Sequence, residues 1–367
     1  MFTRMATDGT EIRLPLEDAY SGPARTGCWI IGGGPALTAL PIERIAASLL
    51  PKFSINLAGH RLLRPTFWTS YDPTGRFQRS TYLDPSITKF VSRGRAMDVV
   101  PGTTGKVCDS PNTLFFHRDP TVGFHNFLYR PASSRGSDAA PVPAGVTDWQ
   151  DSLIQAIHIA YLLGFRTLYF AGCDMHIAPG TAWIERAASV GVQYAPRELL
   201  KDFHHRCLQQ GLTAAEIEAL DSPRQYHFDE AKPLAAALQT DLHYFRVAQY
   251  LRLSRRAISL AGMELISVTP ASRLNDYFSY QSAESVLERI ASEIGEPAHE
   301  PTRGLYTEQA RRAPEGLGPM RDFKPHHWNK EPPLPRPATP ARPSKQERLA
   351  QAAAAIPDIP VSIREEG

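Results

Sequence analysis

The segment Cys28–Leu37, CWIIGGGPAL, is an apolar run that stops at three glycines and a proline. This pattern predicts a first β-strand that ends in a tight turn, followed by a helix-like segment. Glycines permit positive φ and a close approach of a ligand to the backbone, and the start of the next helix would offer N–H groups to an anion. The spacing fits neither G-x-G-x-x-G nor G-x-x-x-x-G-K-[ST]. We therefore expect either a turn that holds a phosphate through backbone groups or a tight turn without a ligand.

The segments after this turn alternate between strand-like and helix-like patterns. Further strands are predicted at 53–57, 67–71, 167–171 and 264–268, with weaker candidates at 87–91 and 113–116. Helices are predicted at 41–50, 149–164, 243–261 and 283–294. Strands that alternate with helices are typical of a parallel sheet covered on both faces. The predicted fold class is therefore α/β, with a doubly wound, mostly parallel sheet.

The distribution of residue types divides the chain into three parts. Residues 1–25 are predicted to be an N-terminal extension, and 26–296 an α/β domain with a helical, lid-like insertion at about 178–240, which the resemblance described below implies to be nucleotide-binding and catalytic. The chain has 32 prolines, and they are concentrated beyond residue 296. A segment of this composition is typical of a flexible tail, which would act as a linker, a docking arm or a passive extension.

Charge and cysteine usage exclude few functions. The 367 residues carry a formal net charge of +2, which neither requires nor excludes a nucleic-acid partner. Four widely spaced cysteines predict free thiols rather than disulfides or a zinc site. We find neither the apolar segment of a signal peptide nor a run long enough for a membrane helix, so the prediction is a cytoplasmic protein.

Polar or glycine residues follow several of the predicted strands. Gly32–Gly34, Asn56, Asp72 and Asp174 each come at or near a strand end. In open α/β sheets, ligands bind outside the carboxyl ends of the strands. We therefore expect these residues to meet at one edge of the sheet.

The order of these motifs resembles a known superfamily. The chain carries IIGGGPAL at 30–37, INLA at 55–58, SYDP at 70–73, AIHIAYLLGFRTLYFAGCD at 156–174 and GMELISVTPASRL at 262–274. This series is similar to the Rossmann-like superfamily that joins bacterial lipooligosaccharide sialyltransferases to 6-hydroxymethylpterin diphosphokinase-like proteins. The resemblance implies a sialyltransferase-like variant of the Rossmann-like fold and a nucleotide-sugar donor, CMP-linked or linked to another nucleotide.

The resemblance also implies roles for individual residues. It places His243 as the general base, and at the donor it places Gly32, Gly33, Gly34, Pro35, Asn56, Ser152 and Ser272. The sequence departs from the sialyltransferase pattern at Gly33 and Asp72, where those enzymes have asparagine. Asp72 together with Asp174 is closer to the diphosphokinase-like branch, in which Mg²⁺ bridges phosphates. These two carboxylates are therefore candidates to orient the donor or to hold a metal.

Two histidines compete for the role of the base. His243 is expected near the start of a helix, behind Thr240 or Asp241 as N-cap, where the helix dipole would lower its pKa and keep the imidazole neutral. His227 is expected in a loop, where functional residues concentrate. For either histidine the alternative is a surface residue without a catalytic role.

The first hypothesis is a glycosyltransferase-like enzyme that moves a sugar from a nucleotide donor to an unspecified hydroxyl on a glycan, a metabolite or a modified nucleic acid. A second is a Mg²⁺-dependent diphosphokinase that uses Asp72 and Asp174. A third is a nucleotide-binding scaffold without catalysis. Dependence of activity on metal separates the first two hypotheses, and turnover separates both from the third.

Overall fold

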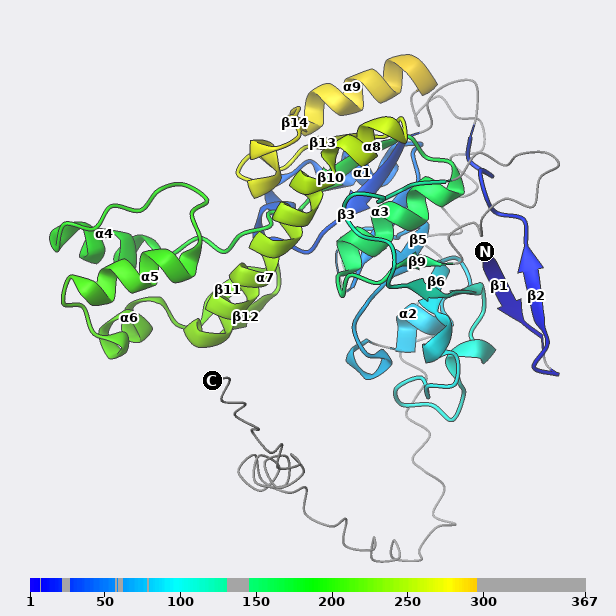
Figure 1. The fold of residues 1–367 in the computed structure, drawn as a ribbon, viewed down its shortest axis with the longest axis horizontal. Coiled ribbons are helices and arrows are strands. Elements are labelled where there is room, and N and C mark those ends of the chain that lie inside the picture. The colour runs from blue at the N-terminus through cyan, green and yellow to red at the C-terminus, as the bar shows by residue number, and fades with distance from the viewer. Residues whose placement is uncertain are drawn as a thin grey trace, which may run out of the picture. The chain divides into compact units, whose positions relative to one another are not determined.

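A computed structural model of the chain describes residues 1–6, 8–21, 27–56, 58, 62–77, 79–130 and 145–295 (Figure 1). All of these residues belong to one compact unit, Met1–Asp322. The predicted flexible tail, 297–367, lies outside the described residues. Within the described residues, no helix is both long and apolar enough to cross a membrane.

Ten strands form one sheet in the described part of the chain. Their order is β14(Ser279–Tyr280), β13(Glu264–Ser267), β10(Thr167–Ala171), β3(Gly27–Ile31), β4(Lys52–Ile55), β5(Phe67–Thr69), β6(Thr88–Ser92), β7(Thr113–Phe116), β1(Phe2–Met5) and β2(Glu11–Leu14). The eight strands from β14 to β7 pair in parallel, and only the pairings that involve β1 and β2 are antiparallel. This confirms the predicted α/β class and the mostly parallel sheet.

Strand residues alternate between two hydrophobic cores, one on each face of the sheet. Cys28 and Ile30 of β3 point into one core, which also contains α3(Ser152–Leu163), α7(Leu234–Leu253) and α8(Arg255–Leu260). Trp29 and Ile31 point into the other, with α1(Ile42–Ala47) and α9(Ala283–Ile294). The period of two in a strand produces this division, and it shows that the sheet is covered on both faces.

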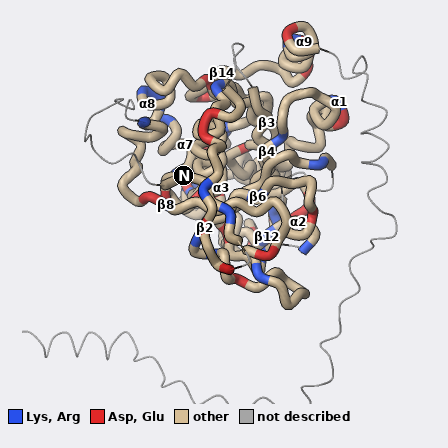
Figure 2. The backbone as a smooth tube through the Cα atoms, turned by 90° about the vertical axis from the view of Figure 1, so that its right-hand side faces the viewer, with Lys and Arg blue, Asp and Glu red and all other residues tan. Residues whose placement is uncertain are grey.

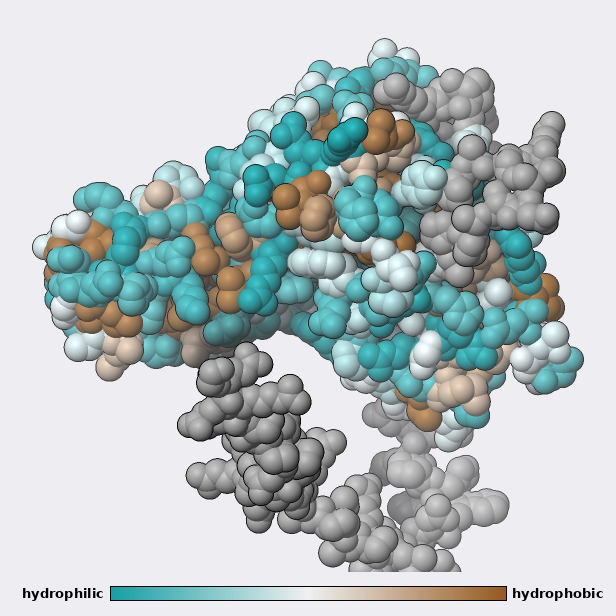
Figure 3. Space-filling model, viewed as in Figure 1, coloured by the Kyte–Doolittle hydropathy of each residue, from teal (hydrophilic) through white to brown (hydrophobic). Residues whose placement is uncertain are grey.

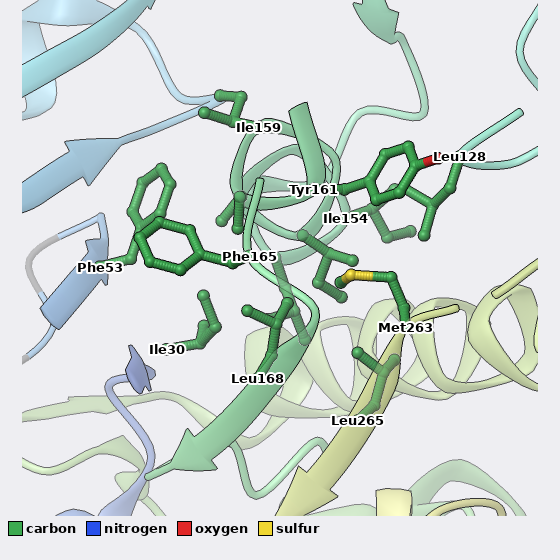
Figure 4. Packing of buried hydrophobic residues seen from close by; sticks show 14 of the residues in the cluster. Ile30, Phe53, Leu128, Ile154, Ile159, Tyr161, Phe165, Leu168, Met263 and Leu265 are labelled. Atoms are coloured by element: carbon green, nitrogen blue, oxygen red, sulfur yellow. The ribbon is translucent and has the colours of Figure 1, made fainter. Parts of the chain in front are cut away.

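Helix α3 is buried on all sides because its sequence, SLIQAIHIAYLL, is apolar in almost every direction. Figure 4 shows Ile159 on one side of α3 and Ile30, Leu168 and Leu265 of the sheet on the other, all within one cluster of buried residues. Each fully buried Ile or Leu side chain contributes about 1.5–3 kcal/mol to folding. The helix begins at the N-cap Asp151 and ends at Gly164, which takes φ +106°.

The insertion between β10 and α7 has a core of its own. It contains α4(Thr181–Ser189), α5(Leu200–Gln209) and α6(Ala214–Asp221), which lie beside one another near one end of α7 (Figure 1). Their apolar side chains form a separate cluster around Trp183 and Phe203. In Figure 3 this lobe shows hydrophobic residues scattered among hydrophilic ones. The insertion ends in a small antiparallel hairpin, β11(Arg224–His227) and β12(Glu230–Lys232).

The remaining elements are short. They are α2(Arg79–Leu83), the parallel pair β8(Arg118–Asp119) and β9(Val146–Thr147), and the 3-10 helices η1(Pro35–Ala39), η2(Thr74–Arg76), η3(Arg93–Arg95), η4(Val107–Asp109) and η5(Arg273–Asp276). The predicted N-terminal extension supplies β1 and β2, which pair with each other and, through β1, with β7.

The prediction of one helix over 243–261 was wrong at its start and in its continuity, while its end before Gly262 was placed within one residue. Helix α7 begins at Leu234, after Pro233, and a separate helix, α8, covers Arg255–Leu260. Asp241 is not an N-cap, since it lies within α7 with no exposed surface and accepts hydrogen bonds from Ile177 N and Leu200 N. A proline just before a helix is a recognised start signal, and here it outweighs the polar residues 239–241.

Candidate functional site

The sheet has a switch point between β3 and β10. From β3 the chain proceeds to β4, β5, β6 and β7 on one side, and it returns to β10 on the other side of β3. Crevices at such points are the usual ligand sites of open parallel sheets. A cavity of about 350 Å³ opens here, lined by Gly32–Gly34 after β3 and by Asp174 after β10. Asn56, Asp72, Ser152 and His243 also line it, so one cavity unites most of the predicted residues.

The glycine turn does not work as the sequence suggested. None of Gly32, Gly33 and Gly34 adopts positive φ, and the helix that follows, η1, is a 3-10 helix of five residues. The N–H groups of Gly32 and Gly34 donate to Ala171 O and Gly172 O, at 2.8 and 2.7 Å. These two amides are therefore already paired within the protein, and the turn leads into a short 3-10 helix rather than the start of a long helix.

The glycines are required instead because their neighbours lie so close. A Cβ atom on Gly32 would lie 2.5 Å from Gly172 O. On Gly33 it would lie 1.9 Å from His227 Nε2, and on Gly34 it would lie 1.8 Å from Asp174 Oδ2. Because the turn has no side chains at these positions, His227 packs against the backbone of Gly33 and Asp174 packs against that of Gly34.

Asp174 is a buried carboxyl group with an unused oxygen. Its Oδ1 accepts a hydrogen bond from Ala36 N at 3.4 Å, and its Oδ2 has no hydrogen-bond partner among the described residues. Burial raises the pKa of Asp174 to about 6. Asp174 lines the cavity, while its Oδ2 is buried against Gly34, and an unpartnered carboxyl oxygen at such a place can donate or accept a hydrogen bond according to its protonation.

Asn56 is held rigidly with its amide nitrogen left over. Its Oδ1 accepts from Ser70 Oγ at 2.6 Å and from Ser152 Oγ at 2.7 Å. Ser152 Oγ in turn accepts from Tyr71 N at 2.9 Å. No hydrogen bond joins Asn56 Nδ2 to another described residue, so this N–H₂ group is a donor available to a ligand. In this arrangement Ser152 orients Asn56.

Backbone strain gathers around the same cavity. Asn56, Gln150 and Met175 all line it, and they have φ of +53°, +58° and +54°. They are three of the seven described non-glycine residues with positive φ. Such residues cost about 1–3 kcal/mol each and cluster at functional sites, which supports the cavity as the site.

His243 and Asp151 form a hydrogen-bonded pair across the cavity. Asp151 Oδ1 caps α3 by accepting from Leu153 N and Ile154 N, at 2.8 and 3.0 Å. Its Oδ2 accepts from His243 Nε2 at 3.1 Å. His243 lies in the middle of α7, so the expected effect of a helix N-terminus is absent, and the hydrogen bond to Asp151 raises the pKa of His243. The prediction of a lowered pKa was wrong.

The β11–β12 hairpin supplies a second imidazole. His227 Nδ1 forms a hydrogen bond with Asp229, two residues further on, and the side chain of His227 is 12% exposed. Phe228 N donates to Gly33 O at 2.9 Å and so fixes the hairpin to the glycine turn. Both candidate histidines therefore line one cavity, each with its own carboxylate.

Cationic groups line the cavity on the side of this hairpin. Lys232 Nζ lies 3.9 Å from the centre of the Tyr226 ring and donates to Thr240 Oγ1 at 3.0 Å, and burial lowers the pKa of Lys232. Arg76 of η2 forms an ion pair of 2.5 Å with Asp72. Asp72 is therefore engaged by an arginine. The described residues contain no group of three or more His, Cys, Asp or Glu side chains that could hold a metal ion.

The lining carries more negative than positive formal charge. Two cations, Arg76 and Lys232, face four carboxyl groups, which gives −2 when all four are ionised and both histidines are neutral; the four are Asp72, Asp151, Asp174 and Glu230. Over the part of the chain that the structure describes, basic and acidic residues are interspersed (Figure 2). The binding of an anionic ligand therefore depends on where the cations lie within the cavity and on the protonation of Asp174 and the histidines.

Two predicted residues do not line the cavity. Ser272 is buried, and its Oγ donates to Cys173 O at 2.6 Å and accepts from Leu274 N at 3.1 Å, so it supports the backbone beside Asp174. Pro35 begins η1 and is not part of the lining.

Sequence reasoning missed Asp151 as the partner of His243, and it missed the whole β11–β12 hairpin. The position of Asp151 just before an apolar helix was a signal for an N-cap, but nothing local indicated its second partner 92 residues away.

Comparison with known proteins does not assign a function to the chain. No family model matches the chain, and no curated protein sequence matches it. Among solved structures, a variant of the sialyltransferase CST-II in complex with CMP matches 70% of this chain and 86% of its own, with 11% sequence identity and a TM-score of 0.28. With so low a TM-score, the match supports neither a fold family nor a function, and the site geometry has to support any functional proposal.

Proposed function

We propose that the chain is a transferase that uses a nucleotide-linked sugar as donor, with His243 as general base. One observation supports this most strongly. The Asp151–His243 pair, Asp174 with its unpartnered buried oxygen, and Asn56 with its spare amide all line a single strained cavity at the switch point of a parallel sheet. Donors and acceptors that stay unpaired at such a point suit a polar ligand such as a nucleotide sugar.

His243 is arranged to accept a proton. Because its Nε2–H donates to the Asp151 carboxylate, the neutral ring has its basic lone pair on Nδ1. In the proposed reaction, Nδ1 takes the proton of the acceptor hydroxyl and the acceptor oxygen forms a bond to the anomeric carbon. The bond from that carbon to the donor phosphate breaks, and its electron pair leaves with the nucleotide. Asp151 holds the ring in place and stabilises the imidazolium that forms.

Asp174 and Asn56 are assigned to the donor. The carboxyl group of Asp174 and the Asn56 amide would hydrogen-bond the hydroxyl groups and heteroatoms of the nucleotide, because neither group is saturated by the protein. Ser152 fixes Asn56 rather than the donor itself, and Asp72 is paired with Arg76. In the alternative Mg²⁺-dependent diphosphokinase, Asp72 would have to exchange Arg76 for the metal.

A thermal-shift screen of the full chain tests the proposal. CMP, CDP, UDP, GDP and ATP are each added at about 1 mM, once with Mg²⁺ and once with EDTA. A ligand that binds the native state with Kd of about 10 μM stabilises it by about 2.7 kcal/mol, or roughly 5–10 °C in Tm. We expect at least one nucleotide to give such a shift in EDTA, and His243→Ala to keep the shift while losing turnover.

Each other outcome of the screen points elsewhere. A shift that requires Mg²⁺ would favour diphosphoryl transfer, and a shift without turnover of any nucleotide sugar would favour a scaffold. No shift with any nucleotide would contradict the proposal. His205→Ala, on the exposed side of α5 and outside the cavity, is the matched control and should behave as the wild type.

A further inference from the structure

The second imidazole, His227, rests directly on the glycine turn. A Cβ atom on Gly33 would lie 1.9 Å from His227 Nε2 and 2.1 Å from its Cδ2, so the edge of the ring that carries Nε2 lies against the Gly33 backbone. The adjacent hydrogen bond from Phe228 N to Gly33 O, 2.9 Å long, holds the hairpin in this position. A side chain at position 33 would therefore displace the imidazole from the turn.

The orientation of the ring is set by Asp229. Since Nδ1 is bonded to that carboxylate, the nitrogen that faces the turn is Nε2. In the protonated ring both nitrogens carry hydrogen, and Nε2–H is then a charged donor directed at the place where β3 ends. Charge-assisted hydrogen bonds of this type are roughly twice as strong as neutral ones.

The hairpin supplies two groups that can donate a hydrogen bond to a phosphate, Lys232 Nζ and His227 Nε2. The lining as a whole is acidic, so a phosphate gains most where cationic groups are local. Arg76 is neutralised by its ion pair with Asp72. Lys232 and His227 both belong to the hairpin, on opposite strands, and the same hairpin carries Asp229, which pairs with His227, and Glu230. By contrast, His243 and Asp151 approach from α7 and α3.

We infer that His227 is a second catalytic residue, which donates a hydrogen bond from Nε2 to the donor phosphate beside Gly33. The inference rests on the proposed function and deepens it. When the bond between the anomeric carbon and the phosphate oxygen breaks, its electron pair becomes negative charge on that oxygen, and the Nε2–H group lies where it stabilises this charge. The acceptor proton goes to His243, so the two imidazoles act on opposite ends of one displacement. Lys232 adds positive charge on the same side.

The test measures how much the phosphate contributes to binding. Titration calorimetry on the full chain gives Kd for a nucleoside and for its 5′-monophosphate, using the cytidine, uridine, guanosine and adenosine pairs. In the wild type we expect the monophosphate to bind more tightly for at least one base. His227→Gln should reduce that ratio roughly 10- to 100-fold, the range for a hydrogen bond to a charged group, and should leave nucleoside binding unchanged.

Two further variants separate contact from folding. Gly33→Ala keeps the imidazole but displaces it from the turn, and it should reduce the ratio as His227→Gln does. Gly94→Ala is the matched control, since its Cβ would meet nothing closer than Ser92 Oγ at 4.0 Å, and it should leave the ratio unchanged. Melting curves show whether each variant is folded.

The outcomes distinguish the inference from the proposed function. A ratio that is unchanged in His227→Gln, or an equal loss for nucleoside and monophosphate, would overturn the role of His227 while leaving the nucleotide site in place. If the wild type bound neither nucleosides nor monophosphates, the proposed function itself would fail and the inference with it.

Discussion

Two carboxylate–imidazole pairs each bring an imidazole to the same cavity, and they are built in different ways. Asp151 and His243 are 92 residues apart in sequence and join the start of α3 to the middle of α7, two helices that pack into the main core. His227 and Asp229 are two residues apart on a hairpin that is not part of the main sheet. Side chains on packed helices are held more precisely than those on loops and small hairpins. The first pair is therefore suited to fixed proton transfer, and the second to contact with a ligand that must enter and leave.

The anchoring of each pair supports this distinction. Asp151 is fixed three times, by Leu153 N, Ile154 N and His243. Within α7, Asp241 is bonded to the buried Arg273, which also donates to Met175 O, and this network fixes the helix against the end of the sheet. The hairpin that carries His227 is tied to the turn chiefly through Phe228 and Gly33.

The largest difference should come from removing each imidazole. His243→Ala should lower turnover of the donor by about 10²–10⁴-fold, the usual contribution of a general base. His227→Gln should lower turnover less, and it should also weaken donor binding. The measurement is the release of nucleotide from the sugar donor that binds best, with His205→Ala as control. Full turnover in His243→Ala, together with none in His227→Gln, would reverse the two roles.

Asp174 differs from the two pairs because it is a buried carboxyl group with no imidazole partner. Its folded pKa of about 6 lies above the ordinary value, so the folded chain favours the protonated form more than the unfolded chain does. Its destabilising effect is therefore absent well below pH 4 and complete above pH 6. Asp174→Asn should stabilise the protein by at most about 3 kcal/mol at pH 8, and the gain should vanish by about pH 4.

Urea unfolding of both proteins at several pH values checks this expectation. A gain that is equal at pH 4 and pH 8 would contradict the assigned burial of the charge. The same variant should bind nucleotide more weakly, as expected where stability and function conflict.

The Asp151–His243 pair should show the opposite dependence on pH. Its hydrogen bond raises the pKa of His243, so the stabilisation is full below the unfolded value and is lost as pH rises through the folded value. Asp151→Asn keeps a side chain able to cap α3 but removes the charge. It should cost up to about 1 kcal/mol at pH 5.5 and less at pH 9, because His243 is partly exposed.

The pH profile of turnover tests the same pair independently. In the wild type, activity should rise with pH as His243 loses its proton, and in Asp151→Asn this rise should move to lower pH. An NMR titration of the imidazole in both proteins gives the pKa directly. An unchanged midpoint would show that Asp151 does not set the basicity of His243.

The smallest expected effect concerns mobility. The amide of Phe228, bonded to Gly33 O, should exchange hydrogen faster than the amides of α7 around Val247, because the hairpin can open without unfolding the core. We expect a difference of at least roughly tenfold, which corresponds to about 1.4 kcal/mol in opening free energy. Equal protection would mean that both pairs are held by one cooperative unit.

The same contrast explains what could be predicted from the sequence. The bounds of β10 and α9 were predicted as Thr167–Ala171 and Ala283–Ile294, because each is a regular pattern between clear end signals. The convergence of Asn56, Asp72 and Asp174 with the glycine turn followed from the parallel sheet alone. The hairpin was missed because its strands are short and polar and lack clear alternation.

Two contacts at the cavity were not predicted from the sequence, and for the same physical reason. The pairing of His243 with Asp151 and the packing of His227 on Gly33 are contacts between segments far apart in the chain. Local patterns carry no record of such contacts, and these contacts set the pKa of His243 and the need for glycine at position 33. The predicted helix start near His243 failed for a local reason, since the signal at Pro233 was not given enough weight.

A crystal structure of the full chain with the nucleotide that gives the largest thermal shift is the most direct test that the donor phosphate binds at His227 and not at the Asp151–His243 pair. We expect the nucleotide phosphate to lie beside Gly33 within hydrogen-bond distance of His227 Nε2. His243 should face the end of the phosphate to which the sugar would be attached. A nucleotide bound outside this cavity, or one whose phosphate lies against the Asp151–His243 pair, would contradict this expectation.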